Sequence, residues 1–363
     1  MEKVLFSGNI DNVKNICIYR IANIGDTVTA IPAMYQIHKR FPDARITLLS
    51  TPTKKGAPGA KEILKDSDWI NKITIYYDSD ISDSSKILKF IKIQRKKHFD
   101  YFIQLPMENT SFKTMIRNLF FAKLIGAQNA TGFYISTLNV FAKTQSKYIN
   151  FPNDVERLIE GLPWKNDREV EFPIGLNKKD ETVLKNLLVE YDINENDPIL
   201  AISFYGKGEA QRWSIKSFNE IAYLWTKSGR KVVVIGGDQQ RNDGDKIINN
   251  LPIDKAYNFC GKLTLLQTMM FLKKAMLLLT VDTGTAHMAS VTKTPCIELF
   301  SSYYLPGKWV AYGDNIVVIR KEIECSPCMS KTCKFGFPAR CMKLIREEEV
   351  WRTIEKIFNL SLL

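Results

Sequence analysis

The chain lacks a long apolar run and a targeting segment, and it has little histidine. No stretch approaches the roughly 18 consecutive apolar residues that a membrane-spanning helix needs, and the candidates are short runs such as 276–281. Residues 1–8 lack the basic start, apolar run and small-residue cleavage site of a secretory signal. With 45% hydrophobic and 25% charged residues, the composition is that of a globular protein. We therefore expect a cytoplasmic protein, and each of its three histidines is by default a core or surface residue.

Cysteine is too unevenly placed for a disulfide framework. Cys17, Cys260 and Cys296 are scattered in apolar, strand-like segments and are interpreted as small core residues. Four others follow the pattern C-x2-C-x4-C-x7-C: Cys325, Cys328, Cys333 and Cys341. Four thiolates at this spacing can close a tetrahedral site, and a leading C-x2-C pair is typical of zinc or iron ligation. A structural metal site and a packed cluster of reduced thiols both fit the pattern.

Acidic residues are outnumbered by basic ones. The 51 Lys and Arg against 39 Asp and Glu give a formal net charge of +12. This excess favours phosphorylated partners, nucleic acid or an anionic membrane surface, although many solvated lysines would give the same balance. No nucleic-acid recognition motif is present, so a non-catalytic nucleic-acid-binding module is kept only as the alternative from a different class.

The chain is long enough for two domains, because 363 residues exceed the length at which one hydrophobic core usually stops growing. Segments rich in Ile, Val and Leu alternate with segments of helical period, which predicts βα units and a parallel sheet. The expected strands are 15–20, 45–50, 72–77, 101–105, 198–204, 231–236, 276–281 and 295–300, and the expected helices are 27–41, 84–97, 214–227, 264–274 and 347–358.

The Lys-rich stretch 84–97 is interpreted as a solvated helix. Gly126 and Gly132 should bracket a turn, and the weakly periodic region 144–180 should hold the linker, with the domain boundary near residue 175.

A glycine and an aspartate follow the first expected strand. Gly25 and Asp26 lie where the strand passes into a helix, at the edge where open α/β sheets bind ligands. Asp26 would then face a ligand. The alternative is that Asp26 only caps the helix, accepting a hydrogen bond from the second or third helical N–H.

The segment 282–287, Asp-Thr-Gly-Thr-Ala-His, joins a buried strand to a helix. Gly284 lets the backbone approach a ligand, and the N–H groups from Thr285 onward, with the positive helix end, suit a diphosphate. Thr283 and Thr285 can add hydroxyl donors. His287 can donate to a phosphate oxygen or hold a loop, or it is a core residue.

Two further turns carry candidate ligand contacts. Arg212 stands at a helix start, where a guanidinium can pair with a phosphate in a bidentate manner, unless it is an ordinary surface arginine. Gly236 and Gly237 end a strand and suit a close approach of a ligand to the backbone, or only a tight turn.

Taken together and in order, these segments resemble glycosyltransferase family 9, the lipopolysaccharide heptosyltransferases. The resemblance runs from the segment Arg20-Ile-Ala-Asn-Ile-Gly-Asp26 with Pro32, through Arg212-Trp213, Gly236-Gly237 and 259–264, to the segment 282–287. The cysteine-rich segment that ends at Met342 is similar to that of many members, particularly the second-heptose type. Nearly the whole chain is covered.

The resemblance implies an α/β fold of GT-B architecture, in which two Rossmann-like domains face each other across a cleft. Residues 1–175 would form the acceptor-binding domain and residues 176–345 the nucleotide-sugar-binding domain. The helix within 346–363 would pack back towards the N-terminal domain.

The resemblance also implies the roles of individual residues. Asp26 would be the general base, and Asn23 and Gly25 would belong to the acceptor-side loop. Arg212 stands where members often carry a lysine, and Thr285 varies from the family pattern. The implied donor site comprises Arg212, Gly236, Gly237, Asp282, Thr283, Gly284, Thr285 and His287.

In this scheme Asp26 removes the proton from an acceptor hydroxyl as that hydroxyl attacks the anomeric carbon, and N–H and basic groups stabilise the departing diphosphate. One displacement inverts the anomeric centre. No Asp-x-Asp metal clamp stands at either motif, so no cofactor is expected for catalysis. A zinc or iron on the four cysteines would be structural.

The expected function is transfer of a heptose or related sugar from an ADP-sugar to a hydroxyl of the lipopolysaccharide inner core. We expect a monomer in peripheral contact with the inner membrane, without a nucleic-acid partner. A protein acceptor, as used by cysteine-rich relatives, stays open, as do the sugar and the linkage. A sugar-nucleotide epimerase of similar architecture is disfavoured because it needs further acid/base residues, and an inactive relative is disfavoured by the presence of Asp26.

Overall fold

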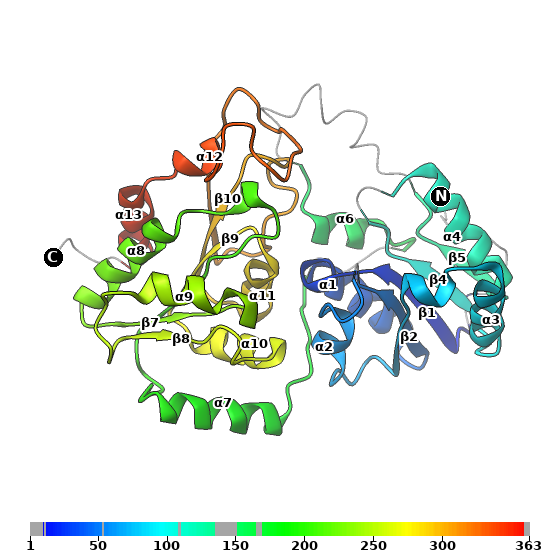
Figure 1. Cartoon of the computed structure of the whole chain (residues 1–363). Helices are drawn as coiled ribbons and strands as arrows, with labels where there is room; N and C mark the ends of the chain where they lie inside the picture. The colour runs from blue at the N-terminus through cyan, green and yellow to red at the C-terminus, as the bar shows by residue number, and fades with distance from the viewer. Residues whose placement is uncertain are drawn as a thin grey trace. The chain divides into compact units, whose positions relative to one another are not determined.

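The computed structural model describes residues 10, 12–52, 54–107, 110–134, 151–164 and 169–358. Contacts between residues divide the chain into two compact units, Met1–Ala142 with Pro152–Gly175, and Lys143–Phe151 with Leu176–Leu363. Each unit contains a parallel sheet with helices packed on it (Figure 1). Among the described residues, no helix is both long and apolar enough to cross a bilayer.

The first unit is built on parallel strands in the order β3-β2-β1-β4-β5. Its described strands are β1 (Asn15–Ile21), β2 (Arg45–Thr51), β3 (Lys72–Ile75), β4 (Tyr101–Gln104) and β5 (Asn129–Thr131). Its described helices are α1 (Ile24–Arg40), α2 (Ala60–Leu64), η1 (Asp78–Ile81), α3 (Ser84–Arg95), α4 (Phe112–Leu124) and α6 (Asp154–Glu160). Ile18 of the central strand lies between Leu48 and Ile103 and is fully buried. The apolar run of β1 is thus explained by burial on both faces of the sheet.

Part of the expected linker is a helix. The sequence predicts a weakly periodic connection over 144–180, but residues 154–160 form α6, with Asn153 as its N-cap. Val155 and Leu158 of this helix are buried, and α6 packs on α1. A seven-residue helix is too short to show a clear periodicity, which is why the pattern missed it. Residues 144–150 and 165–168 of the expected linker lie outside the described residues.

The expected turn between Gly126 and Gly132 is wrong, because strand β5 lies between these glycines. Both glycines have a positive φ, of 80° and 87°. A Cβ atom at Gly132 would lie 1.8 Å from the carbonyl oxygen of Gln104. The glycine therefore lets the chain leave the edge strand directly against β4.

The second unit contains parallel strands in the order β11-β10-β9-β6-β7-β8. Its described strands are β6 (Ile199–Ser203), β7 (Lys231–Val234), β8 (Ala256–Asn258), β9 (Leu277–Val281), β10 (Cys296–Phe300) and β11 (Ile316–Arg320). Its described helices are α7 (Lys178–Glu190), η2 (Glu209–Gln211), α8 (Ile215–Lys227), η3 (Asp238–Gln240), α9 (Arg241–Ile248), α10 (Leu265–Lys274), α11 (Gly284–Thr292), α12 (Arg340–Lys343) and α13 (Glu347–Phe358).

The last helix, α13, is part of the core of the second unit. Val350 and Ile354 on its apolar face are fully buried, and the helix packs on α8. The ring centroid of Phe358 lies 6.4 Å from that of Trp225 on α8. The resemblance implies that residues 346–363 hold a helix that packs back towards the N-terminal domain, whereas the apolar face of α13 packs on the core of the second unit.

Each sheet reverses its winding direction at one place. In the first sheet the reversal lies between β1 and β4, and in the second between β9 and β6. In open α/β sheets, ligands bind outside the carboxyl ends of the strands at such a reversal. The two reversals therefore define where a site should be sought in each unit.

Candidate active site

Asp26 lies in the first turn of α1, directly after the central strand β1. The helix begins at Ile24, so Asn23 is the N-cap and Asp26 is the third helical residue. Asp26 Oδ2 accepts hydrogen bonds of 3.1 Å from both the backbone N and Nδ2 of Asn23. The alternative of Asp26 as the N-cap is therefore wrong, because Asp26 instead reaches back to the cap as in a capping box. Asp26 is 7% exposed, and within the described structure its Oδ1 accepts no hydrogen bond, so one carboxylate oxygen is fixed and the other has no described donor.

The side chain of Arg20, which is buried, forms hydrogen bonds that hold this turn in place. Its Nε donates to the carbonyl oxygen of Asp26 at 3.3 Å, and its Nη1 donates to the carbonyl oxygen of Pro106 at 2.8 Å. Its Nη2 pairs with Asp154 Oδ2 at 3.4 Å, and Asp154 Oδ1 also accepts from Arg157 Nε at 2.7 Å. Arg20 and Asp154 are 2% and 1% exposed. The network ties the start of α1 to the end of β4 and to α6, and so fixes the backbone that carries Asp26.

A pocket of about 330 Å³ opens at the carboxyl ends of β1 and β4, where the first sheet reverses. It is lined by Tyr19 and Ile21 of β1, Gln104 of β4, and Thr114, Arg117 and Asn118 of α4, among others. Gln104 is only 2% exposed, and its Oε1 accepts no hydrogen bond from any described residue. A buried amide oxygen without a donor is costly, and a ligand hydroxyl would satisfy it. The pocket therefore suits a hydroxyl-bearing ligand, and Arg117 at its rim adds a positive charge.

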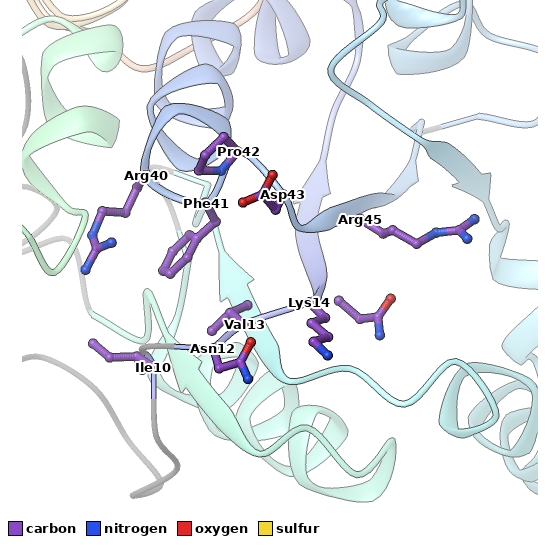
Figure 2. Close-up of a pocket in the computed structure, with 10 residues that line it drawn as sticks. Ile10, Asn12, Val13, Lys14, Arg40, Phe41, Pro42, Asp43 and Arg45 are labelled. Atoms are coloured by element: carbon purple, nitrogen blue, oxygen red, sulfur yellow. The ribbon is translucent and has the colours of Figure 1, made fainter.

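A larger hollow, of about 530 Å³, lies at the opposite edge of the same sheet (Figure 2). Lys14 just before β1, Arg40 and Phe41 at the end of α1, and Arg45 at the start of β2 line it. This is the amino-terminal edge of the strands, whereas open α/β sheets bind ligands at the carboxyl edge. None of the predicted site residues lines this hollow, and we place the candidate site at the other edge.

In the second unit, the turn that begins at Asp282 leads from β9 into α11. The helix begins at Gly284 with Thr283 as its N-cap, and the Thr283 side chain does not cap it. The N–H of Ala286 bonds to the Thr283 carbonyl at 3.0 Å. Thr283, Gly284 and Thr285 are half-buried. The first N–H groups of the helix are thus left for solvent or for an anion.

The Asp282 carboxylate supports a neighbouring loop. It is 2% exposed, and its Oδ2 accepts from Gln211 Nε2 at 2.6 Å. Gln211 Oε1 in turn accepts from the N–H of Gly208 at 2.6 Å. Burial raises the pKa of Asp282 to about 7, while the Gln211 hydrogen bond and the Arg320 charge act to lower it. Asp282 therefore holds the loop after β6 against the turn after β9.

A second buried carboxyl, that of Glu298 in β10, was not predicted. Its Oε2 accepts from the N–H of Ala311 at 2.9 Å. Burial, and next the charge of Asp282, hold the pKa of Glu298 well above its usual range. The sequence could have identified Glu298 as a buried carboxyl, because it is an acidic residue in the middle of an apolar strand. Such a strand in a parallel sheet is buried on both faces.

Arg212 and the glycine pair lie on the turns after β6 and β7, where β6 is the neighbour of β9 and β7 is the next strand beyond it. The Arg212 guanidinium carbon lies 3.8 Å from the ring centroid of Tyr205, and its Nε donates to the Gly206 carbonyl at 3.1 Å. Its two terminal nitrogens bond to no described residue and can reach an anion. The N–H of Gly237 donates to Gln240 Oε1 at 2.7 Å, and a Cβ at Gly236 would lie 2.4 Å from that oxygen. The two glycines thus form a tight turn on Gln240.

His287 is enclosed in the second unit. It is 1% exposed, and its ring centroid lies 5.1 Å from that of Trp309 in an edge-to-face contact. At this exposure the imidazole has almost no surface to offer a phosphate. The geometry favours the alternative of a core residue.

The four clustered cysteines do not converge on one point. Cys341 is buried with its Sγ 3.5 Å from Ser301 Oγ, Cys328 is exposed, and Cys325 and Cys333 are half-buried. In the part of the chain that the structure describes, no three His, Cys, Asp or Glu side chains are grouped so as to hold a metal ion. In this arrangement the thiols do not fit a zinc or iron site, and a structural metal stays a prediction.

The sequence of the chain matches a known family model and is similar to proteins of known function. The family model "Glycosyltransferase family 9 (heptosyltransferase)" matches residues 88–337. The chain is similar to lipooligosaccharide heptosyltransferase 2 of Campylobacter jejuni, with 24% identity over 357 residues that cover 93% of this chain and 95% of that protein.

Two solved structures share the fold. A family 9 glycosyltransferase from Veillonella parvula superposes with a TM-score of 0.76 at 18% identity, covering 96% of this chain and 98% of that one. The ADP-heptose lipopolysaccharide heptosyltransferase II of Escherichia coli superposes with a TM-score of 0.69 at 17% identity, covering 94% and 98%. The predicted α/β fold of two Rossmann-like domains, the GT-B architecture, is confirmed.

Substitution of Asp154 should destabilise the first unit strongly. Asp154→Ala removes the carboxylate that neutralises the buried Arg20, and an uncompensated buried charge costs about 3 kcal/mol or more. Glu171→Ala breaks the half-exposed pair with Lys39 in the same unit and should cost no more than about 1 kcal/mol. Urea unfolding followed by circular dichroism measures both, and equal losses would contradict the role of the Arg20–Asp154 pair.

Asp282 should make stability fall as the pH rises. Its folded pKa of about 7 exceeds the ordinary 3.8, so between these values the folded state holds a proton that the unfolded state releases. The free energy of unfolding should therefore decrease across this window, by up to about 4 kcal/mol from this group, and level off above it. Asp282→Asn lacks this contribution. Unfolding measured from about pH 4 to about pH 8 should show a flatter profile for the variant, and identical profiles would refute the raised pKa.

Proposed function

Because the chain belongs to glycosyltransferase family 9, the heptosyltransferases, we propose that it moves a heptose from an ADP-activated donor to a hydroxyl of the lipopolysaccharide inner core, inverting the anomeric centre. The family model covers more than half of the chain and supports sugar transfer. The names of the relatives support the donor and the acceptor, since one is an ADP-heptose lipopolysaccharide heptosyltransferase and another acts on lipooligosaccharide. The observation that carries the proposal is the half-fixed Asp26 carboxylate at the sheet reversal of the first unit.

Asp26 is proposed as the general base. The hydrogen bonds from Asn23 hold Oδ2, and Oδ1 accepts the proton of the acceptor hydroxyl. As this proton leaves, the acceptor oxygen forms its bond to the anomeric carbon and the bond to the diphosphate breaks. A single displacement from the opposite face inverts the centre. Gly25 and Asn23 form the loop that presents the carboxylate.

The turn from Asp282 to Thr285 and the Arg212 guanidinium are proposed to receive the diphosphate. The uncapped start of α11 offers N–H groups and the positive end of a helix dipole to the developing negative charge. Arg212 adds a cation whose terminal nitrogens are not used within the described structure. Asp282 and His287 then act by holding the turn, and the glycine pair shapes the neighbouring turn. Donor binding and proton removal are thus assigned to different units of the chain.

The pocket between β1 and β4 is proposed to take a sugar of the acceptor. Gln104 Oε1 would accept from a sugar hydroxyl, and Arg117 would meet a carboxylate or phosphate of the core saccharide. The test of the substrates is to incubate the protein with ADP- and UDP-sugars and inner-core acceptors, and to identify the product by mass spectrometry. Transfer only from a UDP-sugar would overturn the donor assignment, and transfer to no core acceptor would overturn the acceptor.

Asp26→Asn should fold and bind donor but transfer almost no sugar. The amide can still accept from Asn23, so the capping contact persists, while loss of general base action lowers kcat about a hundred- to ten-thousandfold. Glu62→Gln is the matched control, because Glu62 is the third residue of α2 and accepts from the N–H of its N-cap, Gly59, at 2.8 Å. The control should keep its activity. Steady-state kinetics and calorimetry with an ADP-sugar measure the two effects, and retention of most activity by Asp26→Asn would remove Asp26 from the mechanism.

Gln104→Leu should weaken acceptor binding without loss of stability. The change removes a buried oxygen that has no donor, while one lost hydrogen bond to the ligand raises the acceptor KM about tenfold. Gln94→Leu is the control, since Gln94 is equally buried but its Oε1 accepts from Lys97 at 2.6 Å. The control should lose stability and keep the acceptor KM. A Gln104→Leu variant with an unchanged KM would show that the pocket does not bind the acceptor.

A further inference from the structure

The outer faces of α3 and α4 expose large apolar side chains. Of the seventeen large hydrophobic residues that are exposed in the described structure, six lie on these two helices: Ile87, Leu88, Ile93, Phe112, Phe120 and Leu124. Leu88 is 59% exposed and Phe120 is 64% exposed. We call the outer surface formed by these six residues and the basic residues between them the α3–α4 face.

The two helices are neighbours whose inner faces are already used in the core. Phe90 and Ile91 of α3, and Phe121 of α4, pack on the core of the first unit. The ring centroids of Phe90 and Phe121 lie 6.0 Å apart in a stacked pair, and Figure 1 shows α3 and α4 close together in the first unit. The six exposed residues are therefore not required for the packing of these helices. The interpretation of 84–97 as a solvated helix is confirmed, since Gln94 is the only buried residue of α3, and its exposed side chains include apolar ones.

The charge on the α3–α4 face is of one sign. Residues 84–97 and 112–124 contain no Asp or Glu. Exposed basic residues alternate with the apolar ones, and they are Lys86, Lys89, Lys92, Arg95, Lys96, Lys113, Arg117 and Lys123. Lys86 is paired with Asp83 just before α3, at 3.5 Å. The face combines apolar side chains with a surplus of positive charge.

Helix α7 also exposes apolar side chains, but it does not combine them with charges of one sign. It also exposes two valines, Val183 and Val189, but its sequence contains Asp180, Glu181 and Glu190 beside its lysines. Isolated apolar residues on a surface of mixed charge are ordinary in soluble proteins. Several exposed apolar residues on neighbouring helices, interspersed with cations of one sign, are typical of surfaces that lie in the headgroup region of an anionic bilayer.

We propose that the α3–α4 face is a docking surface for an anionic lipid bilayer. The exposed leucine, isoleucine and phenylalanine side chains enter the boundary between headgroups and acyl chains, and the lysines neutralise the lipid phosphates. Helix α4 also supplies Thr114 and Arg117 to the pocket between β1 and β4. Docking would thus bring the rim of that pocket to the lipid surface, a consequence that rests on the proposed function, whereas the docking itself does not.

The experiment is co-sedimentation of the full chain with vesicles in the absence of any sugar substrate. Wild-type protein should bind vesicles that contain about one-third phosphatidylglycerol in phosphatidylcholine, and it should bind pure phosphatidylcholine far less, because each cation near an anionic surface contributes about fivefold in affinity. Binding should weaken as salt is raised. Lys89→Glu with Lys92→Glu removes the charge, and Leu88→Ser with Phe120→Ser removes the apolar contact. Either pair should lower the affinity at least about tenfold.

Two controls separate docking from folding and from catalysis. Val183→Ser with Val189→Ser removes the exposed valines of α7 and should leave vesicle binding unchanged. All variants should keep the thermal midpoint of the wild type to within a few degrees, since the altered side chains are exposed. Transfer to a water-soluble, deacylated acceptor should also be unchanged in the α3–α4 variants, so a failed transfer assay would count against the proposed function and not against docking.

The proposal is overturned if the wild type does not bind anionic vesicles, or if both α3–α4 variants bind as well as the wild type. Loss of self-association in these variants without any vesicle binding would assign the face to a second copy of the chain instead. Binding to duplex nucleic acid that the charge variant loses, with no vesicle binding, would assign it to nucleic acid.

Discussion

The contact of the buried Arg20 guanidinium with three separate segments is the constraint on which the candidate base depends. Arg20 joins the carbonyl of Asp26, the carbonyl of Pro106 after β4, and the carboxylate of Asp154 on α6. An arginine can do this because its planar fork offers five donors in fixed directions. Its charge is tolerated in the interior only because Asp154 neutralises it. The position of the Asp26 carboxylate is therefore set by a residue six positions earlier and by a helix far along the chain.

In the second unit, the uncharged side chain of Gln211 holds the candidate turn in place, as Arg20 does in the first unit. The Gln211 side chain donates to Asp282 and accepts from Gly208, so one amide joins the turn after β9 to the loop after β6. The start of α11 keeps its N–H groups free of side-chain caps, in contrast to α8 and α10, whose caps Ser214 and Thr264 accept from the third helical N–H. Helices α9 and α12 of the same unit also lack a side-chain cap, so α11 is distinguished by its place after a strand at the sheet reversal. An uncapped helix start at this place is consistent with the binding of an anion.

The sequence predicted most of the architecture because the buried strands are mostly apolar. Strands β1, β2, β6, β9 and β10 lie within a residue or two of their expected bounds, since a parallel strand covered on both faces is apolar over most of its length. Arg20 of β1 and Glu298 of β10 are buried exceptions. The helix α4 was missed because its apolar residues Phe112, Phe120 and Leu124 point outward and blur the helical period. The edge strands β5 and β8 were missed because three residues give too short an alternation.

The candidate site could be predicted only in part. Residues that follow a central strand, such as Asp26 and Asp282, were found because their place in a βα unit decides where they lie. Asp154 and Gln104 were not found, because their importance comes from contacts with residues distant in the sequence, which no local pattern records. For His287 and the four cysteines the residue types suggested chemistry, whereas the burial of His287 and the different exposures of the thiols favour structural roles, so a donor contact of His287 and a metal on the thiols stay predictions.

The burial of the Asp282 and Glu298 carboxyls also affects how many protons the second unit releases to the surrounding buffer when it unfolds. Burial raises the pKa of Asp282, on the turn after β9, and of Glu298, in β10, so near neutral pH the folded unit binds protons more strongly than the unfolded chain does. Denaturation at neutral pH is therefore also a deprotonation, and the heat absorbed in a calorimeter includes the ionisation heat of whichever buffer takes up the released protons.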